Sequence, residues 1–100
     1  MDAGATRPVI LVVEDEEPIA DVLRLYLHRA GYDVLVARDG ISALDVIRQR
    51  RPQAVILDVG LPGMDGTQVC RTLRAEGDWT PILFCTARDD EVDRVLGLEL

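Results

Sequence analysis

The stretch "VILDVGLPGMDG", Val55 to Gly66, is the part of the sequence that most strongly indicates the fold and the function of this chain. An aliphatic run ends on Asp58, which opens directly into a loop rich in Gly and Pro. Aspartate is a poor strand former and is rarely buried without a partner. A carboxylate at the end of an apolar strand therefore indicates either a structural cap or a chemical site.

The rest of the chain alternates short apolar runs with amphipathic helical patterns. The apolar runs have strand length and mostly β-branched or aliphatic residues: Val9–Val13, Val34–Ala37, Ala54–Leu57 and Ile82–Cys85. Helical spacing follows each run, from Pro18 to Gly31, from Asp39 to Arg50, from the Gly/Pro loop to Gly77, and from about Asp89 onward. We predict an α/β fold, a flavodoxin-like doubly wound parallel sheet with strand order 2-1-3-4.

Length and composition limit the class of protein. The chain has 100 residues, 48% of them hydrophobic, which fits one small domain over residues 1–100. Its net charge is −7 and it contains no Lys, which argues against direct binding of nucleic acid. We see no signal peptide and no membrane span. Cys70 and Cys85 lie in apolar segments without metal-ligand spacing, so we expect buried, reduced thiols in a cytoplasmic protein.

Acidic residues follow the two strands at which such a sheet binds its ligands. In this fold the ligand site lies beyond the carboxyl ends of the first and third strands. Those strands end in Glu14-Asp15 and in Asp58. Converging carboxylates raise one another's pKa unless a cation neutralises them, and Mg²⁺ prefers oxygen ligands. We predict a magnesium site with Asp15 and Asp58 as direct ligands. Glu14 would act through water, and the Gly60 carbonyl would add an oxygen.

A hydroxyl lies at the same edge of the predicted sheet. Thr86 follows the fourth apolar run, so it could donate to an oxyanion held near Asp58. Phosphoryl transfer needs little from a protein beyond alignment and charge neutralisation. A nucleophilic Asp58, a metal ion and this donor could therefore suffice, with an aspartyl phosphate as the product.

Each of these features also has a purely structural interpretation. The acids before Pro18 could cap a helix, and Asp58 could accept from backbone N–H groups of its loop. Both features occur at the strand ends that the fold brings together, which favours a site. His28 is expected on the solvated side of the first helix, and Trp79 is expected to pack on the sheet edge as a loop aromatic.

Three motifs, "ILVVEDEEPI" (Ile10–Ile19), "LDVGLPGMDG" (Leu57–Gly66) and "ILFCTAR" (Ile82–Arg88), strongly resemble the receiver domain of two-component response regulators. The resemblance runs from Val9 to Leu100 and is greatest for the subfamily attached to winged-helix DNA-binding outputs. It implies that Asp58 accepts a phosphoryl group from a sensor histidine kinase. The chain would then be a signalling domain rather than an enzyme.

The resemblance also implies roles for the other residues of the edge. Glu14 and Asp15 match the family's acidic pair, and Thr86 matches its switch hydroxyl. Pro62 and Gly63 lie at the family's loop signature. Gly66 lies where the third helix of the family begins.

This sequence departs from the family pattern at its end. The family continues with a fifth strand, which carries a switch aromatic residue and ends in a Lys followed by a Pro, and then with a fifth helix. None of these is present here, so we expect an engineered truncation or a natural fragment. The fourth strand would then expose an unprotected edge. We expect a homo-oligomer in which another copy covers this edge by strand pairing or domain exchange.

The residue pattern also bears on classes of protein other than a phosphoacceptor. A non-switching structural or dimerising fragment stays open, and magnesium binding would separate it from a working receiver. Aspartate-nucleophile phosphatases resemble D-x-D-x-T, whereas no second acid follows Asp58 at that spacing. No Gly-rich nucleotide loop follows a strand. A calcium loop needs acids or amides where Gly60 and Pro62 stand.

Overall fold

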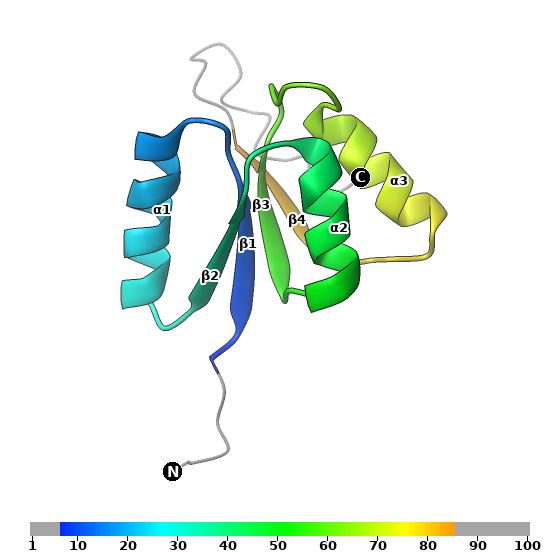
Figure 1. The fold of residues 1–100 in the computed structure, drawn as a ribbon. Coiled ribbons are helices and arrows are strands. Elements are labelled where there is room, and N and C mark those ends of the chain that lie inside the picture. The colour runs from blue at the N-terminus through cyan, green and yellow to red at the C-terminus, as the bar shows by residue number, and fades with distance from the viewer. Residues whose placement is uncertain (1–6, 86–100) are drawn as a thin grey trace.

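The computed structural model describes residues 7–85 of the chain (Figure 1). Within that part the strands are β1 (Val9–Val13), β2 (Asp33–Ala37), β3 (Ala54–Asp58) and β4 (Ile82–Cys85). The helices that alternate with them are α1 (Glu17–Arg29), α2 (Gly40–Arg50) and α3 (Gly66–Ala75). The predicted strands agree with the observed ones to within one residue at each end. The predicted helix from about Asp89 lies outside the described residues.

The strands form one parallel sheet with the order β2-β1-β3-β4. This confirms the predicted flavodoxin-like topology for the four strands that the described residues contain. The strand order reverses between β1 and β3, which lie side by side with Val13 opposite Leu57. Residues that follow these strands therefore come together at one edge of the sheet.

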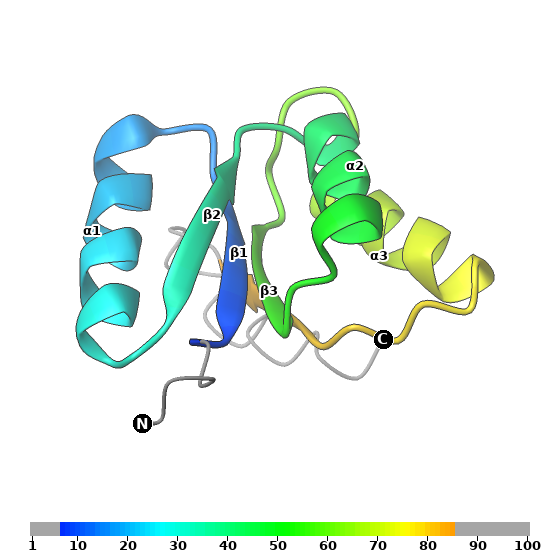
Figure 2. The ribbon, with the colours of Figure 1, turned by 60° about the horizontal axis from the view of Figure 1, so that its bottom comes forward.

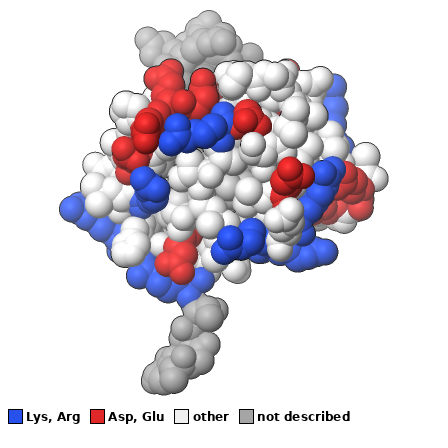
Figure 3. Space-filling view, in the orientation of Figure 1, with Lys and Arg blue, Asp and Glu red and all other residues white. Residues whose placement is uncertain are grey.

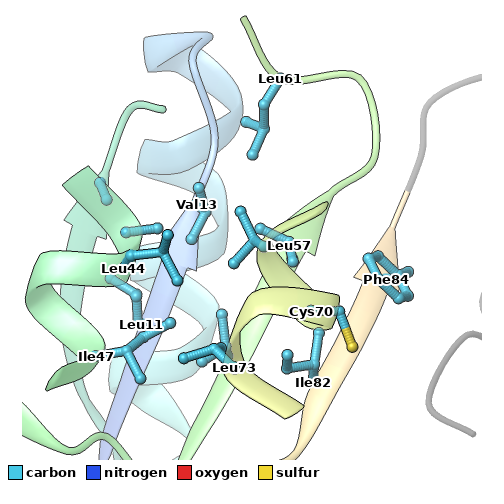
Figure 4. Packing of buried hydrophobic residues seen from close by; sticks show 14 residues of the cluster. Leu11, Val13, Leu44, Ile47, Leu57, Leu61, Cys70, Leu73, Ile82 and Phe84 are labelled. Carbon is cyan, nitrogen blue, oxygen red and sulfur yellow. The ribbon is translucent and has the colours of Figure 1, made fainter. Parts of the chain in front are cut away.

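Helices cover both faces of the sheet (Figures 1 and 2). α1 lies on one face, where it packs against β1 and β2, and α2 and α3 lie together on the other face. The main core lies between the sheet and the α2/α3 pair (Figure 4). Its strand residues are Leu11, Val13, Ala37, Val55, Leu57, Ile82 and Phe84, and its helix residues include Ala43, Leu44, Ile47, Val69, Cys70 and Leu73. All are buried, so this face of the sheet holds the fold together.

Local hydrogen bonds define where α2 and α3 begin. The Asp39 carboxylate accepts from the backbone N–H of Ser42 at 2.7 Å and caps α2. Asp65 caps α3 through a reciprocal pair with Gln68, in which each side chain accepts from the other residue's backbone N–H. Both caps lie just beyond the carboxyl end of the sheet, which fixes the loops there.

The face covered by α1 is packed less completely in the described residues. Ala20 is the buried residue of α1, whereas Val22 and Tyr26 are 51% and 62% exposed. Leu83 of β4 is 40% exposed. The periodicity of the sequence predicted the helix, but it did not predict how much of its apolar side would contact the sheet.

Two expectations about single side chains were wrong. Cys85 is exposed, because the side chains of β4 alternate and Ile82 and Phe84 take the core-facing positions. Trp79 is 70% exposed and stacks on the Arg74 guanidinium, 5.2 Å from its ring centroid, instead of packing on the sheet edge. His28 is exposed as expected, and Cys70 is buried as expected.

None of the helices in residues 7–85 combines the length and the apolar character needed to cross a membrane.

Candidate functional site

The carboxyl ends of β1 and β3 bring Glu14, Asp15 and Asp58 together. Each side chain offers one carboxylate oxygen, and these oxygens all lie within 4.8 Å of one another. Glu14 is buried, Asp58 is half-buried and Asp15 is exposed. The structure thus places the acidic residues singled out in the sequence at a single point of the sheet edge, and we call them the carboxylate cluster.

Glu14 is the member of the cluster with the most constrained environment. The residue is 7% exposed, and among residues 7–85 it is the only charged residue that is buried. Its backbone N–H donates to Ala37 at 3.0 Å, and its carboxylate accepts from the backbone N–H of Glu16 at 3.1 Å. Burial raises the pKa of the Glu14 carboxyl, and the charges of Asp58 and Asp15 add to the increase. An ionised Glu14 is therefore costly in the absence of a cation.

Asp58 ends β3 and is fixed by the loop that follows it. Its Oδ1 accepts from the backbone N–H of Gly60 at 3.1 Å. No other hydrogen bond to its carboxylate comes from residues 7–85. One oxygen is therefore held by the loop, and the other is available at the edge of the sheet.

The start of α3 packs closely against the end of β3. The backbone N–H of Gly66 donates to Val59 at 3.1 Å. A Cβ atom on Gly66 would lie 2.8 Å from the Asp58 carbonyl oxygen and 3.2 Å from the Phe84 ring. In the loop between β3 and α3, Gly63 adopts a φ of 75°, a left-handed conformation that favours glycine. The Gly/Pro loop thus turns sharply and keeps the start of α3 against the end of β3.

No arginine neutralises the cluster within residues 7–85. The ion pairs in that part join Arg7 to Asp33, Arg24 to Asp21, Arg38 to Glu17 and Arg48 to Glu76. Figure 3 shows acidic side chains at the upper left of this face with a basic side chain next to them, and smaller acidic and basic groups over its right and lower parts. A set of oxygen donors with excess negative charge suits a hard divalent cation such as Mg²⁺. Asp15, Asp58 and Glu14 would hold it, and the residues present fit that ion.

The end of β4 lies beside Asp58. Cys85 pairs with Asp58 in the sheet register, and Thr86, the predicted hydroxyl donor, lies outside the described residues. Although solvent reaches Cys85, partial burial and then the charges of Asp58 and Glu14 raise the pKa of its thiol. Cys85 was not among the site residues predicted from the sequence. Strict alternation of side chains along β4 could have placed it on the same face of the sheet as Asp58.

A comparison with protein families identifies what kind of domain carries this cluster. The family model of the response regulator receiver domain matches residues 10–100. The chain belongs to the response regulator receiver domain family. The match covers both strand ends of the cluster and the loop after Asp58, as the resemblance of the sequence motifs implied.

Solved structures agree with this assignment. A putative response regulator from Chloroflexus aurantiacus J-10-fl is 38% identical, with a TM-score of 0.82 over 94% of this chain and 79% of that one. The BeF3-activated N-terminal receiver domain of Klebsiella pneumoniae RstA is 38% identical, with a TM-score of 0.77 over 91% of this chain and 77% of that one. The receiver domain of the Francisella response regulator 1452 is 29% identical, with a TM-score of 0.81 over 92% and 76%.

Proposed function

We propose that this receiver domain accepts a phosphoryl group on Asp58 from a sensor histidine kinase, in a reaction that uses Mg²⁺. The observation that carries the proposal is the carboxylate cluster, whose oxygens lie within 4.8 Å of one another at the point where the strand order reverses. Parallel α/β sheets bind their ligands at this point. Membership of the receiver family supports the same reaction.

The proposed chemistry is a displacement at phosphorus. The Asp58 oxygen that is not held by Gly60 attacks the phosphoryl group, and an O–P bond forms as the N–P bond of the kinase phosphohistidine breaks. The electron pair of the broken bond returns to the imidazole, which can take up a proton. Gly60 orients the nucleophile through its N–H, and the protein contributes mainly alignment and charge neutralisation.

The other residues of the cluster have proposed roles in holding the cation. Asp15 and Asp58 would be direct ligands, Glu14 would act through water and the Gly60 carbonyl would supply a further oxygen. Bound Mg²⁺ would supply positive charge to the phosphoryl oxygens. We propose Thr86 as the hydroxyl that contacts the phosphoryl group and switches the domain.

The wider biological role is also a proposal. Residues 1–100 would be one receiver unit that acts in the cytoplasm and controls a winged-helix DNA-binding output. Direct binding of nucleic acid by this unit is not expected, because its net charge is −7. It would be a signalling domain and not an enzyme.

The proposal is tested with acetyl phosphate as a small phosphodonor, in the presence and absence of Mg²⁺. Intact-mass spectrometry should show addition of one phosphoryl group to the wild-type chain when Mg²⁺ is present. The matched variant Asp58→Asn should remain unmodified. If the wild-type chain is not modified although it binds Mg²⁺, the phosphoacceptor proposal fails. If it does not bind Mg²⁺ either, the alternative of a non-switching fragment is favoured.

We further propose that copies of this chain associate through the outer edge of β4. Within residues 7–85, β4 pairs with β3 on one side only, and strand edges of this kind can pair between chains. Light scattering across a concentration series should therefore show a dimer or a larger assembly. A monodisperse monomer at high concentration would contradict this part of the proposal.

A further inference from the structure

The first residue of α2 contacts the loop that follows Asp58, although α2 contributes no carboxylate to the cluster. Gly40 is buried, and a Cβ atom added to it would lie 2.5 Å from the Met64 carbonyl oxygen. The same Cβ would lie 3.0 Å from Met64 Cβ and 3.0 Å from Val69 Cγ2. Real Cβ atoms essentially never come closer than 3.0 Å to such neighbours, so any side chain at residue 40 must displace the loop or the helix.

The backbone conformation of Gly40 does not itself require glycine. Gly31, Gly63 and Gly77 are the glycines with positive φ in the described residues, and Gly40 is not among them. Alanine is also the better helix former at such a position. The close approach of Met64 is therefore the physical reason for glycine at residue 40.

Met64 links this contact to the cluster. Its side chain packs against the main core, and Leu61, earlier in the same loop, is 6% exposed. The loop therefore has one buried side chain near Asp58 and a backbone contact with α2 near the Asp65 cap. Gly60 lies between Asp58 and these anchors and donates to the Asp58 carboxylate at 3.1 Å. A displacement of Met64 would act on Gly60 through a short, anchored stretch of chain.

We propose that Gly40 is a positioning residue for the carboxylate cluster, because its missing side chain lets the loop of residues 59–65 pack against α2 and hold Gly60 beside Asp58. This inference rests on the proposed function, since it concerns how the same cluster binds Mg²⁺. α2 would thus help to position the cluster, although none of its residues belongs to the cluster. Groups that orient metal ligands typically change metal affinity about 10-fold or more when they are altered.

The experiment is a calorimetric titration of Mg²⁺ into the wild-type chain, Gly40→Ala and Ile47→Val. Ile47 is a buried core residue of α2 near its other end, so Ile47→Val perturbs packing without touching the loop. We expect Gly40→Ala to bind Mg²⁺ roughly 10-fold more weakly and Ile47→Val to bind like the wild type. Modification by acetyl phosphate should be slower for Gly40→Ala at low Mg²⁺ and should recover at saturating Mg²⁺.

The possible results separate this inference from the proposed function. Equal Mg²⁺ affinity of Gly40→Ala and the wild type overturns the role of Gly40 and leaves the phosphoacceptor proposal intact. Absence of Mg²⁺ binding by the wild type overturns both. If circular dichroism shows that Gly40→Ala does not fold, Met64→Gly tests the loop side of the contact, because it removes the Met64 Cβ beside Gly40 and the side chain that packs on the core. Weaker Mg²⁺ binding by that variant supports the inference, and unchanged binding overturns it.

Discussion

The carboxylate cluster at the carboxyl end of the sheet and Asp78 near its amino end have opposite surroundings. At the carboxyl end, the cluster of Glu14, Asp15 and Asp58 has no arginine partner within residues 7–85, and the pKa of Glu14 is raised. At the amino end, Asp78 precedes β4 and accepts from the Thr80 N–H at 2.9 Å and from its hydroxyl at 2.6 Å. These hydrogen bonds lower the pKa of Asp78.

This difference separates an acid that stabilises the fold from the acids of the proposed site. A carboxylate with a lowered pKa favours the folded state at neutral pH, whereas a carboxylate with a raised pKa opposes it. Natural sequences depart from stabilising patterns mainly at functional sites. The carboxylate cluster is such a departure, and the amino end of the sheet provides the control within the same molecule.

The largest expected effect is stabilisation by Mg²⁺. A ligand that binds only the folded state stabilises it by about 2.7 kcal/mol at 100 times its Kd. We expect thermal unfolding of the wild-type chain to shift upward with Mg²⁺, and the shift to be lost in Asp15→Asn. Asp33→Asn, at the amino end of β2, serves as the control and should keep it. An equal shift in Asp15→Asn would mean that the cation binds elsewhere and would remove the contrast between the two ends.

Gly66 and Gly77 allow the packing at the two ends of the sheet to be compared. Gly66→Ala should destabilise the chain by about 1–3 kcal/mol, because its Cβ would crowd the Asp58 carbonyl. Gly77, near the amino end of β4, has a φ of 80° and open space around it, so Gly77→Ala should cost about 1 kcal/mol through backbone strain. Urea unfolding measures both. Asparagine, which tolerates the left-handed region, should be accepted better at residue 77 than at residue 66.

The sequence predicted the strands and the meeting of the cluster because both follow from local pattern and topology. Buried parallel strands read as continuous apolar runs, and their shared direction brings Glu14 and Asp58 to one edge. The sequence could not predict the exposure of Trp79 or the contact between Gly40 and Met64. Both depend on how helices and loops from distant parts of the chain pack, which no local period encodes.

The next largest effect that we expect is a pH-dependent change in stability caused by the titration of Glu14. Because the pKa of Glu14 lies above its ordinary value of 4.5 in the folded state, its contribution to stability is present at low pH. That contribution is lost as the pH rises from about 4.5 through the folded pKa. Without Mg²⁺, Glu14→Gln should therefore be more stable than the wild type at neutral pH and equal to it in acid. A stability difference that does not change with pH would contradict the raised pKa.

Asp78→Asn should show the opposite pH dependence. The folded pKa of Asp78 lies below its ordinary value of 3.8, so its stabilisation is present above that value and is lost as the pH falls through the folded pKa. We expect Asp78→Asn to be less stable than the wild type by about 0.5–1 kcal/mol at neutral pH, reduced by solvent screening. The deficit should vanish in strong acid. Chemical denaturation of both variants over one pH series measures the two slopes together.

The smallest effect is expected for the ion pair between Arg48 and Glu76, which joins the last turn of α2 to the end of α3. Its side chains are 45% and 40% exposed, so water and salt screen the attraction. The hydrogen bond from Arg48 still lowers the pKa of Glu76, as expected for an acid that stabilises the fold. Glu76→Gln should lower the unfolding temperature slightly at low salt and leave it unchanged at high salt. A large decrease in unfolding temperature that does not change with salt would mean that this pair fixes α2 against α3. A single charged group would then matter at the amino end of the sheet, as is proposed for the carboxylate cluster at the other end.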